Sequence, residues 1–182
     1  MGEDMFWAIR GGRGTSFRIV LEFTVTLVSA PETVTIFRVT RTLEENATEL
    51  VYKWQYIAHK IDENLLIRLF LDPGNRTFMA SFVTLYLGGT RDLLAIMEEQ
   101  FPELGLSTSY FIEMSWIESA LFFLRIENRT VEVLLDRTPS SGFGSGYYKG
   151  KSDYVSSPMP VSCPREMWRF LLEEEGYGEL RV

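Results

Sequence analysis

The chain has 182 residues, enough for one ordinary domain or slightly more. Hydrophobic residues make up 46% and charged residues 24%, so the composition is that of a globular chain and excludes collagen, coiled coil and disorder. The formal net charge is −7 and there is no basic stripe, which argues against a nucleic-acid partner. No apolar run reaches the roughly 18 residues of a membrane span.

The first thirty residues predict a helix, a glycine-rich turn and a strand. Residues 3–10 are typical of a short helix, and the glycines from Gly11 onward end it. Residues 16–28 are β-branched or aromatic and partly alternate with polar ones, which predicts a strand. Pro31 separates this strand from the next, at 33–39. We therefore place a domain boundary there, between 1–30 and 31–182.

The second part of the chain predicts an order of β-α-β-β-α, followed by further elements. Thr42 and Glu45 form a capping box for its first helix, and Thr90 or Asp92 caps the next. An antiparallel sheet with helices on one face, an α+β arrangement, is the predicted fold. The predicted elements after 33–39 are a helix at 42–61, strands at 65–71 and 78–87 in a hairpin, a helix from about 90 to 101, a short strand and a helix within 111–123, an extended segment at 131–135, a loop at 139–150, a short strand at 151–155 and a helix at 164–175.

The single cysteine and single histidine exclude several kinds of site. Cys163 has no second cysteine for an internal disulfide, and a zinc site of His and Cys ligands cannot be built. A Ser-His-Asp triad would have to use His59, which lies in the charged segment KWQYIAHKID without a nucleophile motif nearby. We predict a surface histidine, a half-exposed loop thiol and no metal site.

Other residues that attract notice are interpreted as structural. Trp54, Trp116 and Trp168 lie on apolar faces and are predicted to be in the core. The carboxylates of Glu113 and Glu118 are predicted to lie on a helix surface or to assist packing.

Three of the four asparagines begin N-glycosylation acceptor sequences, at Asn46, Asn75 and Asn128. Because random placement would seldom give this proportion, the pattern favours a secretory history. The first residues, MGEDMFWAIRGGRG, lack the basic and apolar regions of a signal peptide. Together these features predict a piece of a longer, secreted or cell-wall protein. A chain that truly started at Met1 would stay in the cytosol.

The strongest candidate for chemistry is the glycine-rich turn within residues 7–20, WAIRGGRGTSFRIV. Glycines let backbone amides approach a ligand closely, which would suit a phosphate-bearing cofactor. A tight turn that uses glycine for positive φ is the alternative, and spacing alone favours it. The Rossmann fingerprint does not apply, because no strand precedes the glycines and a strand rather than a helix follows.

The same residues resemble a known family. GEDMFWAIRGGRGTSFRIVLEFTVTLV is similar to the end of the flavin domain in the berberine bridge enzyme-like oxidoreductases of plants, within the vanillyl-alcohol oxidase and p-cresol methylhydroxylase superfamily. The family pattern is approximately DLFWAIRGGGG-SFGIV. The resemblance covers nearly the whole chain, in order, through TLEENATELVYKWQYIAHKIDENLLIR, ASFVTLYLGG, FPELGL, IEMSWIES, LLDRTP and KSDYVSSPMP.

The resemblance implies a segment of an FAD-dependent oxidase or dehydrogenase that transfers hydride from an alcohol, sugar or alkaloid-like substrate to flavin. Such enzymes bury FAD in one domain and cover its ring with an antiparallel sheet of a second. Residues 1–30 would end the FAD-binding domain and 31–182 would begin the substrate-binding domain, and no partner protein is implied. The residues that would line FAD are Gly12, Gly14, Ser16, Phe17, Ile19 and Val20.

Two departures from the family pattern bear on the cofactor. Arg13 and Arg18 stand where the family usually has glycine. If position 18 needs positive φ, arginine there costs roughly 1 kcal/mol or more in strain, and it could also clash with FAD. The alternative is that Arg18 reaches a phosphate as a cation; of the two, we favour an impaired fit.

The resemblance also implies that important residues lie elsewhere. The family attaches FAD through a His and a Cys that precede this region, and its catalytic base lies beyond Val182. No catalytic residue is therefore assigned within the chain. Two functions stay open: a segment of an FAD-dependent oxidoreductase, or a truncated, non-catalytic relative that keeps the fold segment without binding FAD. We expect the isolated chain to be inactive.

Overall fold

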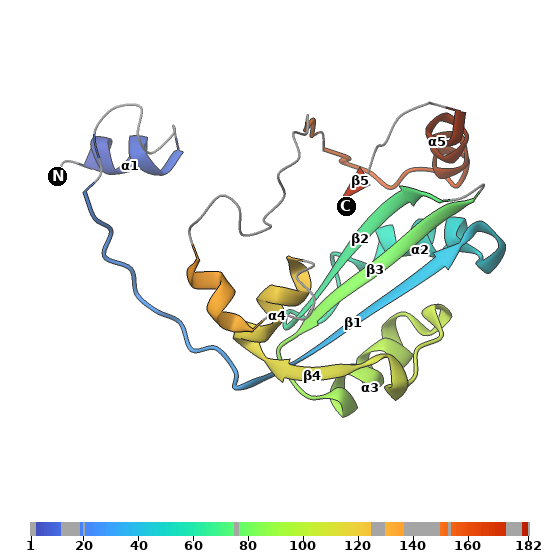
Figure 1. Ribbon diagram of the computed structural model, residues 1–182. Coiled ribbons are helices and arrows are strands. Elements are labelled where there is room, and N and C mark those ends of the chain that lie inside the picture. The colour runs from blue at the N-terminus through green and yellow to red at the C-terminus, as the bar shows by residue number, and fades with distance from the viewer. Residues whose placement is uncertain are drawn as a thin grey trace. The chain divides into compact units, whose positions relative to one another are not determined.

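The computed structural model describes residues 3–11, 19, 21–74, 77–124, 130–136, 150–152, 154–173 and 180–181. The chain divides into two units, Met1–Ala30 and Pro31–Val182. Helix α1 belongs to the first unit, and the other described helices and strands belong to the second (Figure 1).

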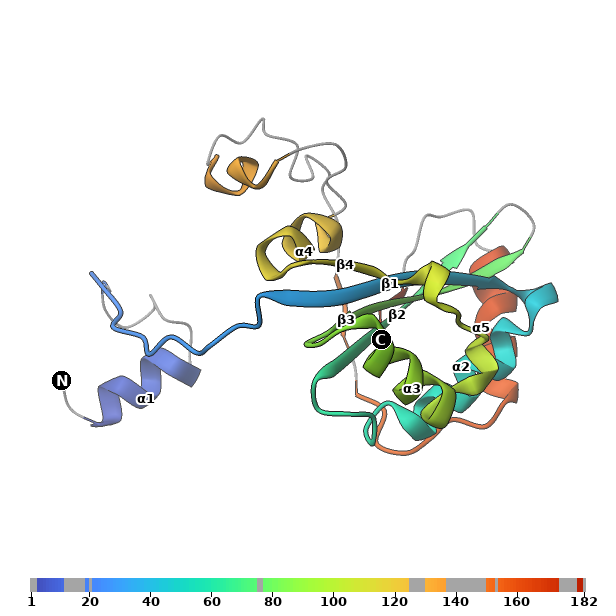
Figure 2. The ribbon, with the colours of Figure 1, turned by 90° about the horizontal axis from the view of Figure 1, so that it is seen from below.

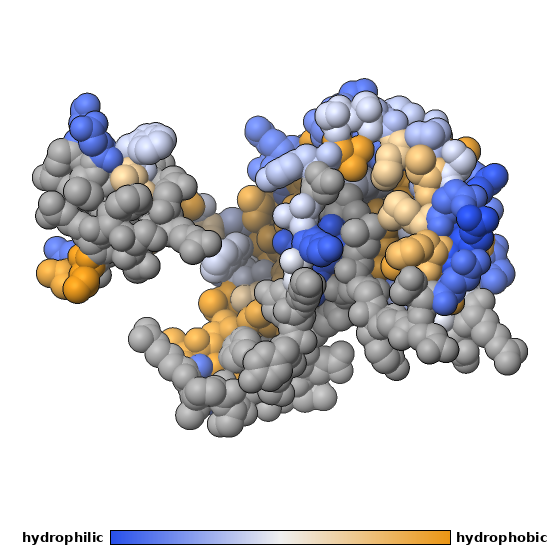
Figure 3. All heavy atoms as spheres, turned by 90° about the horizontal axis from the view of Figure 1, so that it is seen from above, coloured by the Kyte–Doolittle hydropathy of each residue, from blue (hydrophilic) through white to orange (hydrophobic). Residues whose placement is uncertain are grey.

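In the first unit, α1 spans Glu3–Gly11 and confirms the predicted helix. Ile19 and residues 21–30 have no regular secondary structure and are exposed. Apolar atoms are visible at the surface of this unit, at the left of Figure 3. The predicted strand at 16–28 is wrong over the residues that are described. A strand is held by backbone hydrogen bonds to a neighbour, and none of the described strands pairs with this segment.

The second unit is built on one antiparallel sheet in the order β4-β1-β3-β2-β5 (Figure 1). Its three long strands are rich in β-branched and aromatic residues, which suit a pleated, buried surface. Thr35 of β1 lies opposite Tyr86 of β3, which in turn lies opposite Leu65 of β2. The strands are β1 (Thr33–Thr42), β2 (Leu65–Pro73), β3 (Phe78–Tyr86), β4 (Ile112–Ser115) and β5 (Leu180–Arg181).

The sheet confirms the predicted α+β class, including the hairpin of β2 and β3. Figure 2 shows α2 (Ala47–Ile57), α3 (Thr90–Gln100) and α5 (Ser162–Glu173) on one face. Alternate strand residues on this face enter the core, among them Phe37 and Phe82. Helix α4 (Trp116–Phe123) packs against β1 on the opposite face, so the helices are not confined to one face as predicted.

The predicted helix at 42–61 is two helices separated by Asn46. The predicted capping box of Thr42 and Glu45 is confirmed, but it begins a 3-10 helix at Leu43–Glu45. Asn46 then adopts a left-handed backbone with φ of 62°, a conformation that asparagine tolerates better than most residues. Helix α2 starts after it and ends at Ile57.

Helix α3 begins differently from the prediction. Its N-cap is Gly89, so neither Thr90 nor Asp92 caps it. The carboxylate of Glu113, from β4, instead accepts a hydrogen bond of 2.7 Å from the backbone N–H of Thr90. This bond is the main reason that the pKa of Glu113 is lowered, and a bond from the Thr90 side chain adds to it. A carboxylate supplied by a distant strand thus takes the place of a local cap.

Three other predictions differ from the structure. Residues 131–135 form a 3-10 helix, Val131–Leu135, rather than an extended segment. The described residues within 151–155 form no strand, because no described strand pairs with them. Only residue 150 of the predicted loop at 139–150 lies within the described residues. The final helix is confirmed and begins at Ser162.

Two of the three tryptophans predicted to be in the core are buried, Trp54 and Trp168. Trp116 is 48% exposed, so that prediction is wrong. It is the first residue of α4. Trp168 stacks on Phe78 with ring centroids 3.8 Å apart, and this contact fixes α5 against the sheet.

Replacing Trp168 with alanine should lower the free energy of unfolding of the chain by about 3–5 kcal/mol, because a buried aromatic side chain is lost. Trp168→Phe keeps an apolar ring but loses the hydrogen bond to Thr48 and part of the buried ring, so it should cost less than the alanine change, about 1–3 kcal/mol. Urea denaturation measures both. The control is Phe170→Ala on the same helix, whose exposed ring should matter by less than about 0.5 kcal/mol. Equal losses for the two alanine variants would contradict the assignment.

Candidate functional site

The residues predicted to line a cofactor lie mostly outside the described part of the chain. Gly12, Gly14, Ser16, Phe17 and Val20 fall in that category, as do Arg13 and Arg18. Ile19 is described, and 88% of its surface is exposed. Its contact with FAD stays a prediction.

The second unit offers a further candidate, the sheet face opposite α2, α3 and α5, which we call the open face. The period of two along each strand, together with the register, sets its members. It includes arginines, hydroxyls and one deeply placed aromatic ring. Apart from the buried Val34 and Ile36 at the start of β1, the open face consists of Arg38, Thr40, Thr42, Leu66, Arg68, Phe70, Asp72, Met79, Ser81, Val83, Leu85 and Arg181.

A polar row crosses the middle of the open face. Thr40 of β1 and Ser81 of β3 are direct partners, and their hydroxyl oxygens lie 2.8 Å apart in a hydrogen bond. The next residue in the row is Phe70 of β2, which is 7% exposed, followed by Arg181 of β5. The guanidinium carbon of Arg181 lies 5.6 Å from the centre of the Phe70 ring, within range of a cation–π contact. Hydroxyl, aromatic and cationic groups therefore follow one another across β1, β3, β2 and β5.

Helix α4 borders the open face at β1. The guanidinium of Arg38 lies 5.0 Å from the centre of the Phe122 ring of α4. Helix α4 starts with a capping box, in which the Glu118 carboxylate accepts bonds of 2.8 Å from the backbone N–H and 2.7 Å from the hydroxyl of Ser115. These bonds, the hydroxyl first, lower the pKa of Glu118. Glu118 lies on a helix surface, as predicted, whereas Glu113 lies on strand β4 and bonds to the start of α3.

Among the described strand positions of the open face, arginines outnumber carboxylates. The strand positions that the structure describes on this face include three arginines, Arg38, Arg68 and Arg181, and one carboxylate, Asp72. The chain as a whole has a net charge of −7. Arg68 is exposed, and its guanidinium can bind ligands with hydroxyl, carbonyl or anionic oxygens. The hydroxyl pair adds hydrogen-bonding groups, whereas the Phe70 ring is buried and adds packing within the face.

The two residues excluded from catalysis by the sequence lie away from this face. His59 is exposed just after α2, as predicted. Cys163 is half-buried, in the first turn of α5 rather than in a loop. Within the described ranges, no group of three or more His, Cys, Asp or Glu side chains is placed to hold a metal ion. None of the described helices is long and apolar enough to cross a membrane.

The open face could not be identified from the sequence, because no local motif marks it. Thr40 and Ser81 are 41 residues apart, and only the register of β1 on β3 brings them together. The one available signal was the alternation in the second half of β1, where the polar residues Arg38, Thr40 and Thr42 indicate that this side of the strand is not core.

No protein-family model matches the chain. The chain is 43% identical over 175 residues to berberine bridge enzyme-like 18 of Arabidopsis thaliana, covering 96% of the chain and 32% of that relative. It is 47% identical over 173 residues to tetrahydroberberine oxidase of Berberis wilsoniae, covering 89% of the chain and 32% of the relative. The crystal structure of Phl p 4, a grass pollen allergen with glucose dehydrogenase activity, matches with a TM-score of 0.88 and 36% identity, covering 99% of the chain and 36% of that structure. The chain thus spans about a third of the length of these relatives.

The capping box of α4 should make the chain sensitive to acid. Because the folded pKa of Glu118 is lowered, its contribution to stability is present above the ordinary pKa of a carboxyl group and is lost as the pH falls through the folded value. Glu118→Gln should therefore reduce the fall in thermal unfolding midpoint between about pH 7 and pH 3. The control is Glu98→Gln, at an exposed position of α3, which should leave that fall unchanged. The same fall in both variants would contradict the role of Glu118.

Proposed function

Because the chain belongs to the berberine bridge enzyme-like family, we propose that it is a segment of an FAD-dependent oxidoreductase of plants. The observation that carries this proposal is the open face, a cationic and hydroxyl-bearing surface on an otherwise acidic chain. It is the side of the sheet that the described helices α2, α3 and α5 leave uncovered. The relatives named above support the reaction class, since their names describe an oxidase and a dehydrogenase.

The first unit, 1–30, is proposed to end an FAD-binding domain. Gly12, Gly14, Ser16, Phe17, Ile19 and Val20 are the proposed cofactor contacts. Ile19 fits this role, since its side chain is exposed and open to an apolar contact. The segment that follows, 21–30, is exposed and has no strand partner among the described residues, so its backbone is available to a neighbouring strand of such a domain.

The second unit, 31–182, is proposed to be part of a substrate-binding domain, with the open face as one wall of the site. FAD, when bound, would supply the acceptor for a hydride from the substrate. The residues of this chain bind and orient the substrate: Thr40 and Ser81 offer hydroxyls, and the exposed Arg68 offers a charged donor. No catalytic base is assigned to these residues.

The sequons and the family support a secreted or cell-wall glycoprotein as the parent of this chain. Its substrate is a small molecule with an oxidisable carbon, such as an alcohol, a sugar or an alkaloid-like amine. Tetrahydroberberine and glucose are two probes, because they are named for relatives.

The proposal is tested in the full-length flavoprotein that contains this chain. Arg68→Ala should lower kcat/KM by about tenfold or more, because a charged hydrogen bond to substrate is lost, while the bound flavin stays unchanged by absorbance. The control, Arg169→Ala on α5, removes an exposed arginine that pairs with Glu166 on the helix side and should leave kcat/KM unchanged. Rates of flavin reduction with each probe measure the effect. Equal rates for wild type and Arg68→Ala with a reactive substrate would contradict the role of the open face.

A further inference from the structure

A groove of about 440 Å³ lies along α2, next to the first acceptor sequence for N-glycosylation. Asn46, the acceptor residue, is one of its lining residues. Tyr52, Lys53 and Tyr56 of α2 and Glu103 also line it. Neither the core nor the open face contains these side chains.

The side chain of Asn46 does not make the hydrogen bond that is usual at a helix N-cap. An N-cap asparagine commonly accepts a backbone hydrogen bond with its side chain, but Asn46 makes no such bond. Asn46 instead joins the two helices through its backbone. Its N–H donates to the Leu43 carbonyl, and its carbonyl accepts a hydrogen bond of 3.1 Å from the Leu50 N–H. The carboxamide is left at an exposed position. The nitrogen that would carry a sugar is therefore accessible.

The groove has the chemistry of a surface that contacts carbohydrate. The rings of Tyr52 and Tyr56 meet edge to face with centroids 5.3 Å apart, and their hydroxyls are 3.1 Å apart. Such rings offer an apolar face beside a polar tip. Lys53 pairs with Glu103 and lowers the pKa of that carboxyl, mainly through the hydrogen bond. Paired charges and phenols can bond a neutral sugar, whereas the excess of carboxylates in the lining repels an anion.

The helix places part of the groove lining in line with Asn46, while Tyr52 and Tyr56 lie about a quarter to a third of a turn to one side. Positions three, four and seven residues further on share one face of an α-helix, and these are Glu49, Leu50 and Lys53. From Asn46 to Lys53 the helix rises about 10 Å, which the first sugars of a glycan can span. A tethered ligand has an effective concentration in the millimolar range, so an open groove suffices to hold it.

We propose that Asn46 carries an N-linked glycan and that its first sugars lie in this groove against Tyr52 and Tyr56. The inference rests on the proposed secretory route. It extends that route by naming one acceptor and the surface that holds its glycan.

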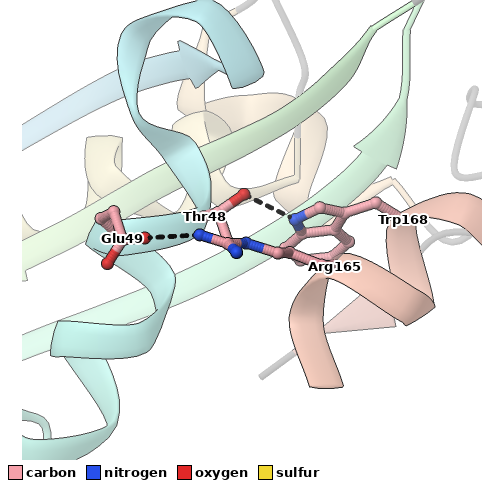
Figure 4. Close-up of polar contacts among 4 residues, drawn as sticks. All are labelled: Thr48, Glu49, Arg165 and Trp168. Carbon is pink, nitrogen blue, oxygen red and sulfur yellow. Dashed lines mark hydrogen bonds and ion pairs between the residues drawn. The ribbon is translucent and has the colours of Figure 1, made fainter. Parts of the chain in front are cut away.

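The structure also sets when the sugar is attached. In the folded chain, Trp168 Nε1 donates a hydrogen bond of 3.0 Å to the hydroxyl of Thr48, the third residue of the acceptor sequence (Figure 4). Arg165 of the same helix binds Glu49 at 3.2 Å. The hydroxyl belongs to the acceptor signal, so these contacts block it once α5 has docked. Trp168 follows Thr48 by 120 residues, which leaves Thr48 free while the later chain is being made. Transfer therefore precedes the docking of α5.

The test directs the full chain into the secretory pathway of plant cells with an added leader, so that the acceptor is tested whatever the native route. Peptide mass spectrometry after enzymatic glycan removal in heavy-oxygen water marks each used asparagine. Asn46 should be marked. Asn46→Gly should lose one glycan while keeping the positive φ, and Thr48→Ser should keep it. An unmarked Asn46 in secreted protein would overturn the proposal.

The groove is tested by the rate of glycan removal from the native chain. The double variant Tyr52→Ala, Tyr56→Ala should release the Asn46 glycan about tenfold faster, because the sugars are no longer held. Tyr110→Ala, at an exposed position in the 3-10 helix Thr108–Tyr110, is the control and should not change the rate. After denaturation all rates should be equal. A double variant that matches wild type in the native state would overturn the groove assignment.

Discussion

The alternation of side chains along β1, β3 and β2 is the constraint on which the second unit depends. Because successive residues of a strand point to opposite faces, one set of positions packs beneath α2, α3 and α5 and the other set lies on the opposite face of the sheet. Phe37 and Phe82 belong to the first set and meet the helices. Thr40 and Ser81 belong to the second and meet each other. A slip of one residue between strands would exchange the sets, so the register positions both the core and the candidate site.

The helical layer is closed by contacts between residues that are distant in the sequence. Helix α5 returns to the start of α2, where Trp168 touches both Phe78 of the sheet and Thr48 of the helix. Glu113 crosses from β4 to the first turn of α3. Contacts of this kind form after local structure, since the loop between the partners must first be closed. Helix α5 and strand β4 are therefore expected to make these contacts after α2 and α3 have formed.

Local signals predicted much of the fold, and non-local ones account for what was missed. The β2–β3 hairpin, the helix α5 and the capping box at Thr42 depend on neighbouring residues, and each was predicted. The strand at 16–28 was not found among the described residues, because propensity cannot supply a partner strand. The cap of α3 was missed because its carboxylate, Glu113, comes from a strand formed later in the chain.

The candidate site shows the same division. The glycine-rich turn and the family resemblance could be read from adjacent residues, and they nominated the cofactor contacts from Gly12 to Val20. The open face required the register of three strands, and the groove on α2 required Glu103 from beyond α3. The sequence also led to the wrong prediction that Trp116 is in the core, because a pattern of apolar residues does not distinguish the first residue of a helix from one further along its apolar stripe.

One edge of the sheet has a consequence for how it can grow. In the described part of the chain, β5 pairs only with Phe70 and Leu71 of β2. The outer side of β2 from Leu65 to Leu69 therefore presents backbone donors and acceptors that no described strand uses, beside the half-exposed side chain of Leu66. A strand arriving there would extend the open face and the core layer together, because its side chains would alternate in step with those of β2. The pairing of β2 therefore determines which side chains of an added strand would enter the core layer and which would lie on the open face.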